Sequence, residues 1–184
     1  MTYYGGKELA AAFRTVRDNT IKIAEEIPES KYDFRPAPET KSVAMTLAHL
    51  AVVPGFQHHV QNTKVTDLST VNFMELFQKF QAEENKPRTK DEMIAFLKSE
   101  GDTFASFLEG LPESFLAEQV MFPPGAEPAT KTRFEMLLSV KEHEMHHRAQ
   151  LMTIQRMIGQ VPHLTRVMQE RMAQRQAAQT QAAR

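Results

Sequence analysis

Apolar side chains recur at helical spacing along most of the chain, and the strict alternation typical of strands is scarce. Long stretches with a three-to-four-residue apolar repeat cover residues 7–26, 42–61, 89–109 and 132–158. A shorter helix is expected over residues 72–83. The pattern therefore predicts an all-α protein built from four long helices and a short extra one.

Local signals at the helix ends support these boundaries. Ser42, Thr89 and Thr132 each precede an apolar stripe and are suitable N-caps. Glu92 and Glu135 follow the two threonines at the third position, which is the spacing of a capping box. We therefore expect three of the long helices to begin at these residues.

The length of the chain, 184 residues, suits a single core. Residues 1–162 are expected to form one helical domain. A further helical segment, residues 163–184, follows Pro162 and ends in a Gln- and Ala-rich stretch without an apolar stripe. We predict a C-terminal helical extension that is frayed at its end.

Charge and composition exclude several functions. The formal net charge is −1, so no strong field would attract nucleic acid or an anionic membrane. No apolar run approaches the roughly 20 residues of a membrane span, and no signal-peptide pattern is seen, so a cytoplasmic location is expected. Cysteine is absent. A metal would therefore need His, Asp or Glu ligands, and thiol chemistry would need an external thiol.

Three histidines interrupt apolar stripes. His143 and His147 stand four residues apart in the stripe of the last long helix, so their rings project from one face. His49 interrupts the stripe of the second long helix in the same way. Three inward imidazoles on facing helices can surround one divalent ion at about 2.0–2.1 Å per nitrogen. A lone core histidine is more often only hydrogen-bonded, but three together favour a metal site.

The other four histidines fit this site less well. His58 is expected to face solvent, and His59 and His146 lie beside their stripes. His163 follows Pro162 and is expected at a helix cap or at the surface.

Residues 143–147 also match the H-E-x-x-H pattern of zinc metalloproteases, with Glu144 as the base. Glu170 would be the downstream third ligand, but no strand is expected beside the site, and His49 would then have no role. A ferritin-like di-iron site needs two Glu-x-x-His motifs, and only one is present. A structural metal remains an alternative, although structural zinc normally has four protein ligands.

Three further residues are candidates for the chemistry. Glu100 lies on the apolar face of the third long helix, where it could orient a histidine or serve as a base, or reach water at the edge. Glu144 is next to a ligand and could act similarly, although a surface position is the simpler interpretation. Arg148 could hold an anionic substrate or only cover the bundle.

Two motifs and their order resemble those of the DinB-like (YfiT-type) superfamily of metal-binding helical bundles. The matching segments are Ser42–Leu50 (SVAMTLAHL) and His143–Leu151 (HEMHHRAQL), preceded by Tyr32–Pro38 (YDFRPAP). The usual Arg-Gly-Gln after the last histidine appears here as Arg-Ala-Gln at residues 148–150, a change that touches no ligand.

The resemblance implies an up-down-down-up four-helix bundle, often a homodimer, with Zn²⁺ or Ni²⁺ on His49, His143 and His147. Some members are thiol-dependent S-transferases or isomerases that use bacillithiol, mycothiol or glutathione, and many others are described only as metal-dependent hydrolases. We therefore expect a metal-dependent enzyme with a small-molecule substrate, acting by S-transfer from a low-molecular-weight thiol. Metal-dependent hydrolysis and a non-catalytic structural metal are the alternatives.

Overall fold

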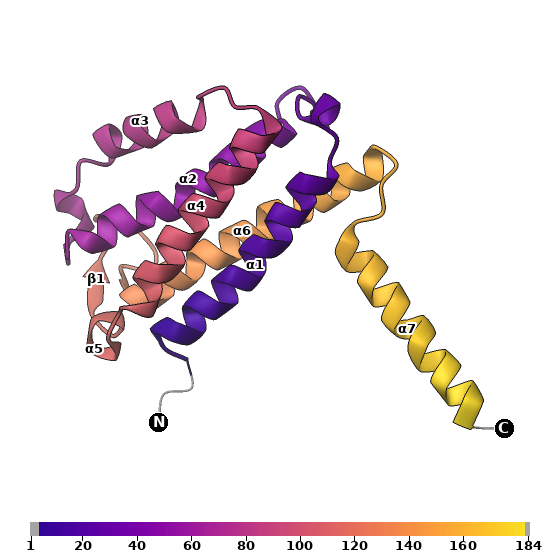
Figure 1. Ribbon diagram of the computed structural model, residues 1–184. Coiled ribbons are helices and arrows are strands. Elements are labelled where there is room, and N and C mark those ends of the chain that lie inside the picture. The colour runs from indigo at the N-terminus through magenta and orange to yellow at the C-terminus, as the bar shows by residue number, and fades with distance from the viewer. Residues whose placement is uncertain (1–3, 183–184) are drawn as a thin grey trace.

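The computed structural model describes residues 4–182 and confirms an all-α bundle. Four long helices form it, with α1 and α6 running in one direction and α2 and α4 in the other, as the up-down-down-up topology requires (Figure 1). Their bounds are α1 Gly6–Glu26, α2 Val43–Asn62, α4 Lys90–Glu109 and α6 Arg133–Met157. All four agree closely with the stretches expected from the apolar repeat.

Shorter elements connect the long helices. The helical ones are η1 Glu29–Lys31, η2 Leu68–Thr70, α3 Phe73–Glu84 and α5 Glu113–Leu116. Two strands, β1 Gln119–Met121 and β2 Thr130–Thr132, pair antiparallel, with Val120 opposite Lys131. The pattern did not predict this hairpin, because three-residue strands offer too few positions for an alternation to be recognised.

The predicted N-caps are confirmed. The Ser42 side chain accepts a hydrogen bond from the backbone N–H of Met45. Thr89 and Thr132 both form complete capping boxes with the glutamates three residues later. These bonds satisfy backbone groups that the first turn of a helix leaves without partners.

The four long helices enclose the core in a fixed order. α1 and α2 each pack against both α4 and α6, so α1 and α2 lie diagonally opposite each other. Helix α3 packs against α2 and leads the chain back to the start of α4, which lets α2 and α4 run in the same direction (Figure 1). The ligand-bearing helices α2 and α6 are thus direct neighbours.

The last helix, α7 (His163–Ala182), extends away from the bundle (Figure 1). Its first residue is 8% exposed, whereas every described residue from Arg166 onward is exposed. The Gln- and Ala-rich stretch, residues 174–184, is helical as far as Ala182, and residues 183–184 lie outside the described part. The expected fraying of this stretch stays a prediction. The division into 1–162 and 163–184 stays a prediction.

Within residues 4–182, no helix is both long and apolar enough to cross a bilayer.

Candidate metal centre

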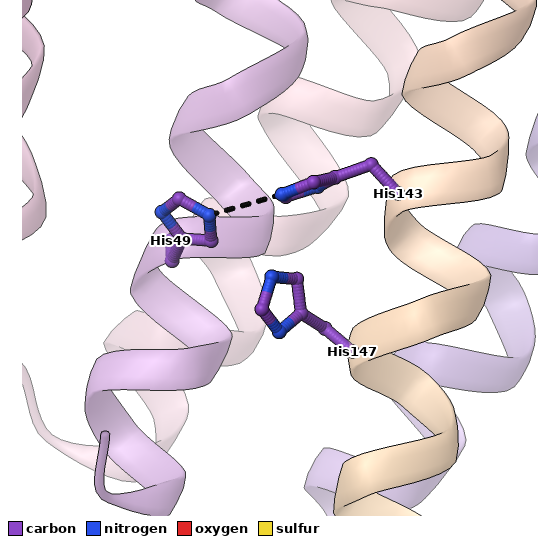
Figure 2. Close-up of side chains that lie close together, drawn as sticks. All are labelled: His49, His143 and His147. Carbon is purple, nitrogen blue, oxygen red and sulfur yellow. Dashed lines mark hydrogen bonds between the residues drawn. The ribbon is translucent and has the colours of Figure 1, made fainter. Parts of the chain in front are cut away.

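The structure brings the three predicted histidines together. His49 extends from α2 toward α6, and His143 and His147 extend from successive turns of α6 toward α2 (Figure 2). Nε2 of His49 lies 3.2 Å from Nε2 of His143. One ring nitrogen from each residue lies within 4.8 Å of the others. Two distant stretches of the chain therefore place three nitrogen donors around one point.

Glu84, at the end of α3, sets the proton position on His49. Its Oε2 lies 2.8 Å from Nδ1 of His49, and its other oxygen pairs with Lys41. Burial alone would raise the pKa of Glu84, but His49 and Lys41 lower it below its usual value. The ionised carboxylate can only accept, so His49 donates through Nδ1 and keeps a lone pair on Nε2.

Gln150 sets the proton position on His147. Its side-chain oxygen accepts from Nδ1 of His147 at 2.8 Å, and its amide nitrogen donates to Nε2 of His146 at 3.1 Å. His147 therefore also carries its lone pair on Nε2. His146, expected beside the stripe, is exposed; besides its bond to Gln150, its ring lies edge to face with that of His147, with centroids 5.0 Å apart.

Burial keeps His143 and His147 uncharged near pH 7. Desolvation, together with the neighbouring imidazoles, lowers the pKa of His143 to about 4. Burial also lowers the pKa of His147 from its ordinary value. Both rings are therefore neutral near pH 7, which is the form that binds a metal.

The donor set fits a borderline divalent ion such as Zn²⁺ or Ni²⁺. Two nitrogens at tetrahedral angles about 2.0–2.1 Å from an ion are about 3.3 Å apart, close to the 3.2 Å between His49 and His143. Among the described residues, the candidate cluster contains these three ligands and no carboxylate. An ion held here would keep a coordination position for water or substrate.

Glu144 does not lie at the surface, so that interpretation was wrong. It is 1% exposed, and its Oε2 lies 3.0 Å from a guanidinium nitrogen of Arg17 on α1, which is itself 3% exposed. Burial raises the pKa of Glu144, and Arg17 opposes this effect. The carboxylate is thus directed at α1, a placement that speaks against the metalloprotease interpretation and favours a structural role.

The sequence did not indicate that Arg17 is buried. A single arginine within an apolar stripe cannot be told from an exposed residue at the edge of that stripe. Its guanidinium donates to the backbone oxygen of Leu50 at 2.7 Å and to that of Leu97 at 3.2 Å. Leu50 follows His49, and Glu144 follows His143. One buried side chain on α1 therefore contacts the neighbours of two candidate ligands.

Glu100 and Arg148 are the other two residues predicted to take part in the chemistry. Glu100 is partly buried, with Oε2 against the Gly55 backbone of α2, and burial raises its pKa. None of its described contacts reaches the histidines. Arg148 is partly buried and interacts electrostatically with Glu144. A catalytic role for either residue stays a prediction.

His58 differs from expectation, whereas His163 lies at the first position of α7, as expected of a cap-region residue, but not at the surface. His58 is not solvent-facing but partly buried against Phe107, with ring centroids 4.3 Å apart, and burial lowers its pKa. His163 is buried, and its Nε2 bonds to Asn19 of α1 at 2.9 Å. Both rings thus have packing roles that a helical pattern alone does not reveal.

Two cavities flank the histidine cluster. The first, here called the threonine cavity, has a volume of about 450 Å³. Its lining is Pro36, Thr40, Lys41, Thr46, His147, Gln150, Thr153 and Ile154. The second, the phenylalanine cavity, has a volume of about 290 Å³. Its lining is Lys41, His49, Val52, Val53, Phe56, Gln57, Phe77, Phe80, Gln81 and Glu84. Each cavity includes a candidate ligand, and Lys41 borders both.

A family model decides the relationship that the motifs suggested. The model of the DinB superfamily matches residues 12–151, a span that contains most of the bundle and all three histidines. The chain belongs to the DinB superfamily. A comparison with curated protein sequences gave no match.

Several solved structures of other proteins have a similar fold. A DinB-like protein from Bacillus subtilis is 21% identical, with a TM-score of 0.63, over 84% of this chain and 94% of that one. YfiT from Bacillus subtilis, described as a probable metal-dependent hydrolase with an unusual four-helix bundle topology, is 14% identical, with a TM-score of 0.65, over 87% and 91%. An uncharacterized protein from Clostridium difficile 630 is 14% identical, with a TM-score of 0.63, over 85% and 98%. At these identities the likeness supports the fold alone.

Proposed function

We propose that this DinB superfamily protein is a metal-dependent S-transferase, which joins a low-molecular-weight thiol through its sulfur to a small organic acceptor. His49, His143 and His147 would hold Zn²⁺ or Ni²⁺. The observation that carries the proposal is the position of the histidine cluster between two cavities, each with a candidate ligand in its lining. A transfer between two molecules needs two such spaces, whereas hydrolysis needs one space and water.

The threonine cavity suits the thiol. The ammonium of Lys41 pairs with Glu84 and still has protons to donate to a carboxylate of a peptide-like thiol. The hydroxyls of Thr40 and Thr46 donate to the backbone oxygens of Ala37 and Ser42, so toward the cavity they can accept from the amide N–H groups of such a thiol. Its volume of about 450 Å³ lies within the usual range for small-ligand sites. The chain has no cysteine, so the sulfur would come from this second molecule.

The chemistry divides between the cation and the chain. A divalent cation, when bound, supplies positive charge that lowers the pKa of a thiol or of water. Glu84 and Gln150 hold the rings of His49 and His147 in the tautomer that exposes Nε2. In the overall step the thiol proton passes to solvent, the sulfur electron pair forms a carbon–sulfur bond, and the leaving group departs with the electron pair of the bond it breaks.

The test uses the full chain loaded with zinc or nickel. It is incubated with chlorodinitrobenzene as acceptor, with and without glutathione or cysteine, beside an activated ester as a hydrolysis substrate. We expect turnover above the uncatalysed rate only when a thiol is present. The His147→Ala variant should lose both stoichiometric metal and turnover, whereas His59→Ala, which changes an exposed histidine of α2, should keep both.

The alternatives give different results. Thiol-independent ester turnover would support hydrolysis, the activity named for YfiT, and would contradict S-transfer. No turnover combined with a large loss of stability on chelation would indicate a structural metal. Retention of metal in His49→Ala or His147→Ala would contradict that residue as a ligand.

A further inference from the structure

The phenylalanine cavity is chemically uneven. Five of its lining side chains are aliphatic or aromatic, and they come from two helices, with Val52, Val53 and Phe56 on α2 and Phe77 and Phe80 on α3. The rings of Phe56 and Phe80 meet edge to face, with centroids 5.6 Å apart. These walls can bury an apolar group but offer it no hydrogen bonds.

The other five lining side chains are polar: the candidate ligand His49, together with Lys41, Gln57, Gln81 and Glu84. His49 and Glu84 are bonded to each other, and Lys41 pairs with the same carboxylate. The charges of Lys41 and Glu84 compensate each other, so no excess positive charge is left in the wall for a strongly anionic ligand. A molecule in the cavity therefore places a polar group toward His49 and an apolar body against the phenylalanines.

Phe77 shows that the apolar wall continues to the surface. It lines the cavity, yet 57% of the side chain is exposed. An exposed aromatic ring at the mouth of a pocket can cover a bound apolar group and remove more of its surface from water. Phe77 is thus placed to contribute to binding and little to the core.

Resting on the proposed function, we propose that the acceptor is a small uncharged molecule with an aromatic or branched apolar body and one polar electrophilic end. The volume of about 290 Å³ is at the lower end for ligand pockets, which limits the molecule to about the size of one substituted aromatic ring. The apolar body lies against Phe56, Phe77 and Phe80, and the electrophilic end lies toward His49. Nucleotides and other polyanions do not fit this cavity in size or charge.

Two ketones test the assignment without any reaction. Benzylacetone and butanone share the carbonyl end and differ by a phenyl group. Each is titrated into the zinc-loaded full chain, and binding is followed through the methyl NMR signals of the protein. We expect benzylacetone to bind at least about tenfold more tightly, because burial of a phenyl-sized group exceeds the free energy of one factor of ten.

Two matched variants locate the effect. Phe77→Ser should reduce the preference for benzylacetone several-fold while keeping stoichiometric zinc. Met74→Ser changes a residue of the same helix that is 68% exposed and outside the cavity lining, and it should leave the preference unchanged.

The outcomes separate this inference from the proposed function. Equal affinity for the two ketones, or an equal loss in both variants, would overturn the assignment even if thiol-dependent turnover is found. A clear preference for benzylacetone that depends on Phe77, in a protein without thiol-dependent turnover, would support the cavity assignment and contradict S-transfer.

Discussion

Glu84 and Gln150 decide which nitrogen of two histidines carries the proton. Each accepts a hydrogen bond from Nδ1 and so leaves Nε2 of its histidine available to a metal. Nδ1 of His143, in contrast, is buried without a hydrogen-bond partner among the described residues, so the protein does not set its tautomer. The strength of the site should therefore depend on residues that never touch the ion.

Replacing Glu84 tests this dependence. Glu84→Ala removes the acceptor that orients His49, and we expect zinc affinity to fall by about 10- to 100-fold. Competition titration with a chromogenic chelator measures the change. Glu83→Ala is the matched control, since Glu83 pairs with Lys86 and Arg88 instead of a histidine. Equal zinc affinity in the two variants would show that Glu84 does not orient His49.

The low pKa of His143 predicts how stability varies with pH in the metal-free protein. The pKa is about 4 in the folded chain and about 6.5 in an unfolded one, so the unfolded state binds more protons between these values. This contribution to stability is fully present above pH 6.5 and is lost as the pH falls toward 4. Urea unfolding of metal-free protein across this range, beside His143→Gln, measures it. A variant with the same pH dependence as the parent would contradict the shift.

The sequence predicted the three histidines because each replaces an apolar residue in a helical stripe. It did not reveal Glu84, whose contact with His49 depends on where the short helix α3 folds. Glu144 was misplaced for a related reason. Helix α6 packs against both α1 and α2, so it buries two faces, and a single stripe describes only one of them.

At the scale of elements, Arg17 joins all four long helices. From α1 it pairs with Glu144 on α6 and donates to backbone oxygens of Leu50 on α2 and Leu97 on α4. Its stem also packs closely against α4, because a Cβ added at Gly101 would lie 2.8 Å from Cγ of Arg17. The buried guanidinium of Arg17 therefore helps to fix the distance between α2 and α6, the helices that carry the candidate ligands.

Removing that charge should be costly. Arg17→Met leaves Glu144 buried without its partner, and we expect a loss of about 3–5 kcal/mol in the free energy of unfolding. The Arg17→Met/Glu144→Leu double variant should recover much of this loss, because no uncompensated charge remains. Arg14→Met, which removes a partly exposed pair with Glu109, should cost less than about 1 kcal/mol. Urea denaturation measures all three, and equal losses for Arg14 and Arg17 would contradict the buried-charge argument.

Elements with strong local signals were predicted well. Capping side chains and long apolar repeats act within a few residues of the chain, so the four long helices and their N-caps followed from the sequence. The β1–β2 hairpin did not, because it depends on pairing between three-residue strands and on burial of Val120 in a distant cluster.

At the scale of the whole molecule, the path of α3 creates the second cavity. The chain returns along α2 before α4 begins, and this brings Phe77, Phe80 and Glu84 beside His49 (Figure 1). Helix α3 therefore provides both part of the apolar wall of the phenylalanine cavity and the carboxylate that orients His49. The fold that allows α2 and α4 to run in the same direction thus also builds one side of the candidate site.

Helix α7 contacts the bundle only near its start, so we expect that its far part can be removed without unfolding the bundle. His163 bonds to Asn19, and Arg166 pairs with Glu26, whereas the residues beyond them are exposed as far as Ala182. A chain that ends at Glu170 should keep its metal and change Tm by less than about 2 °C, since exposed residues contribute little to stability. A chain that ends at Pro162 loses both contacts and should melt several degrees lower.

Calorimetry and metal analysis of the two shortened chains check this prediction, and sedimentation equilibrium adds the oligomeric state. The exposed part of α7 carries Val167, Met168 and Met172, which are 38%, 62% and 59% exposed. The chain that ends at Glu170 loses Met172 but keeps Val167 and Met168, so a large fall in its Tm would mean that the part of α7 beyond Glu170 is covered in solution. The homodimer implied by the motifs stays a prediction, and conversion of a dimer to a monomer by that truncation would locate its interface on α7.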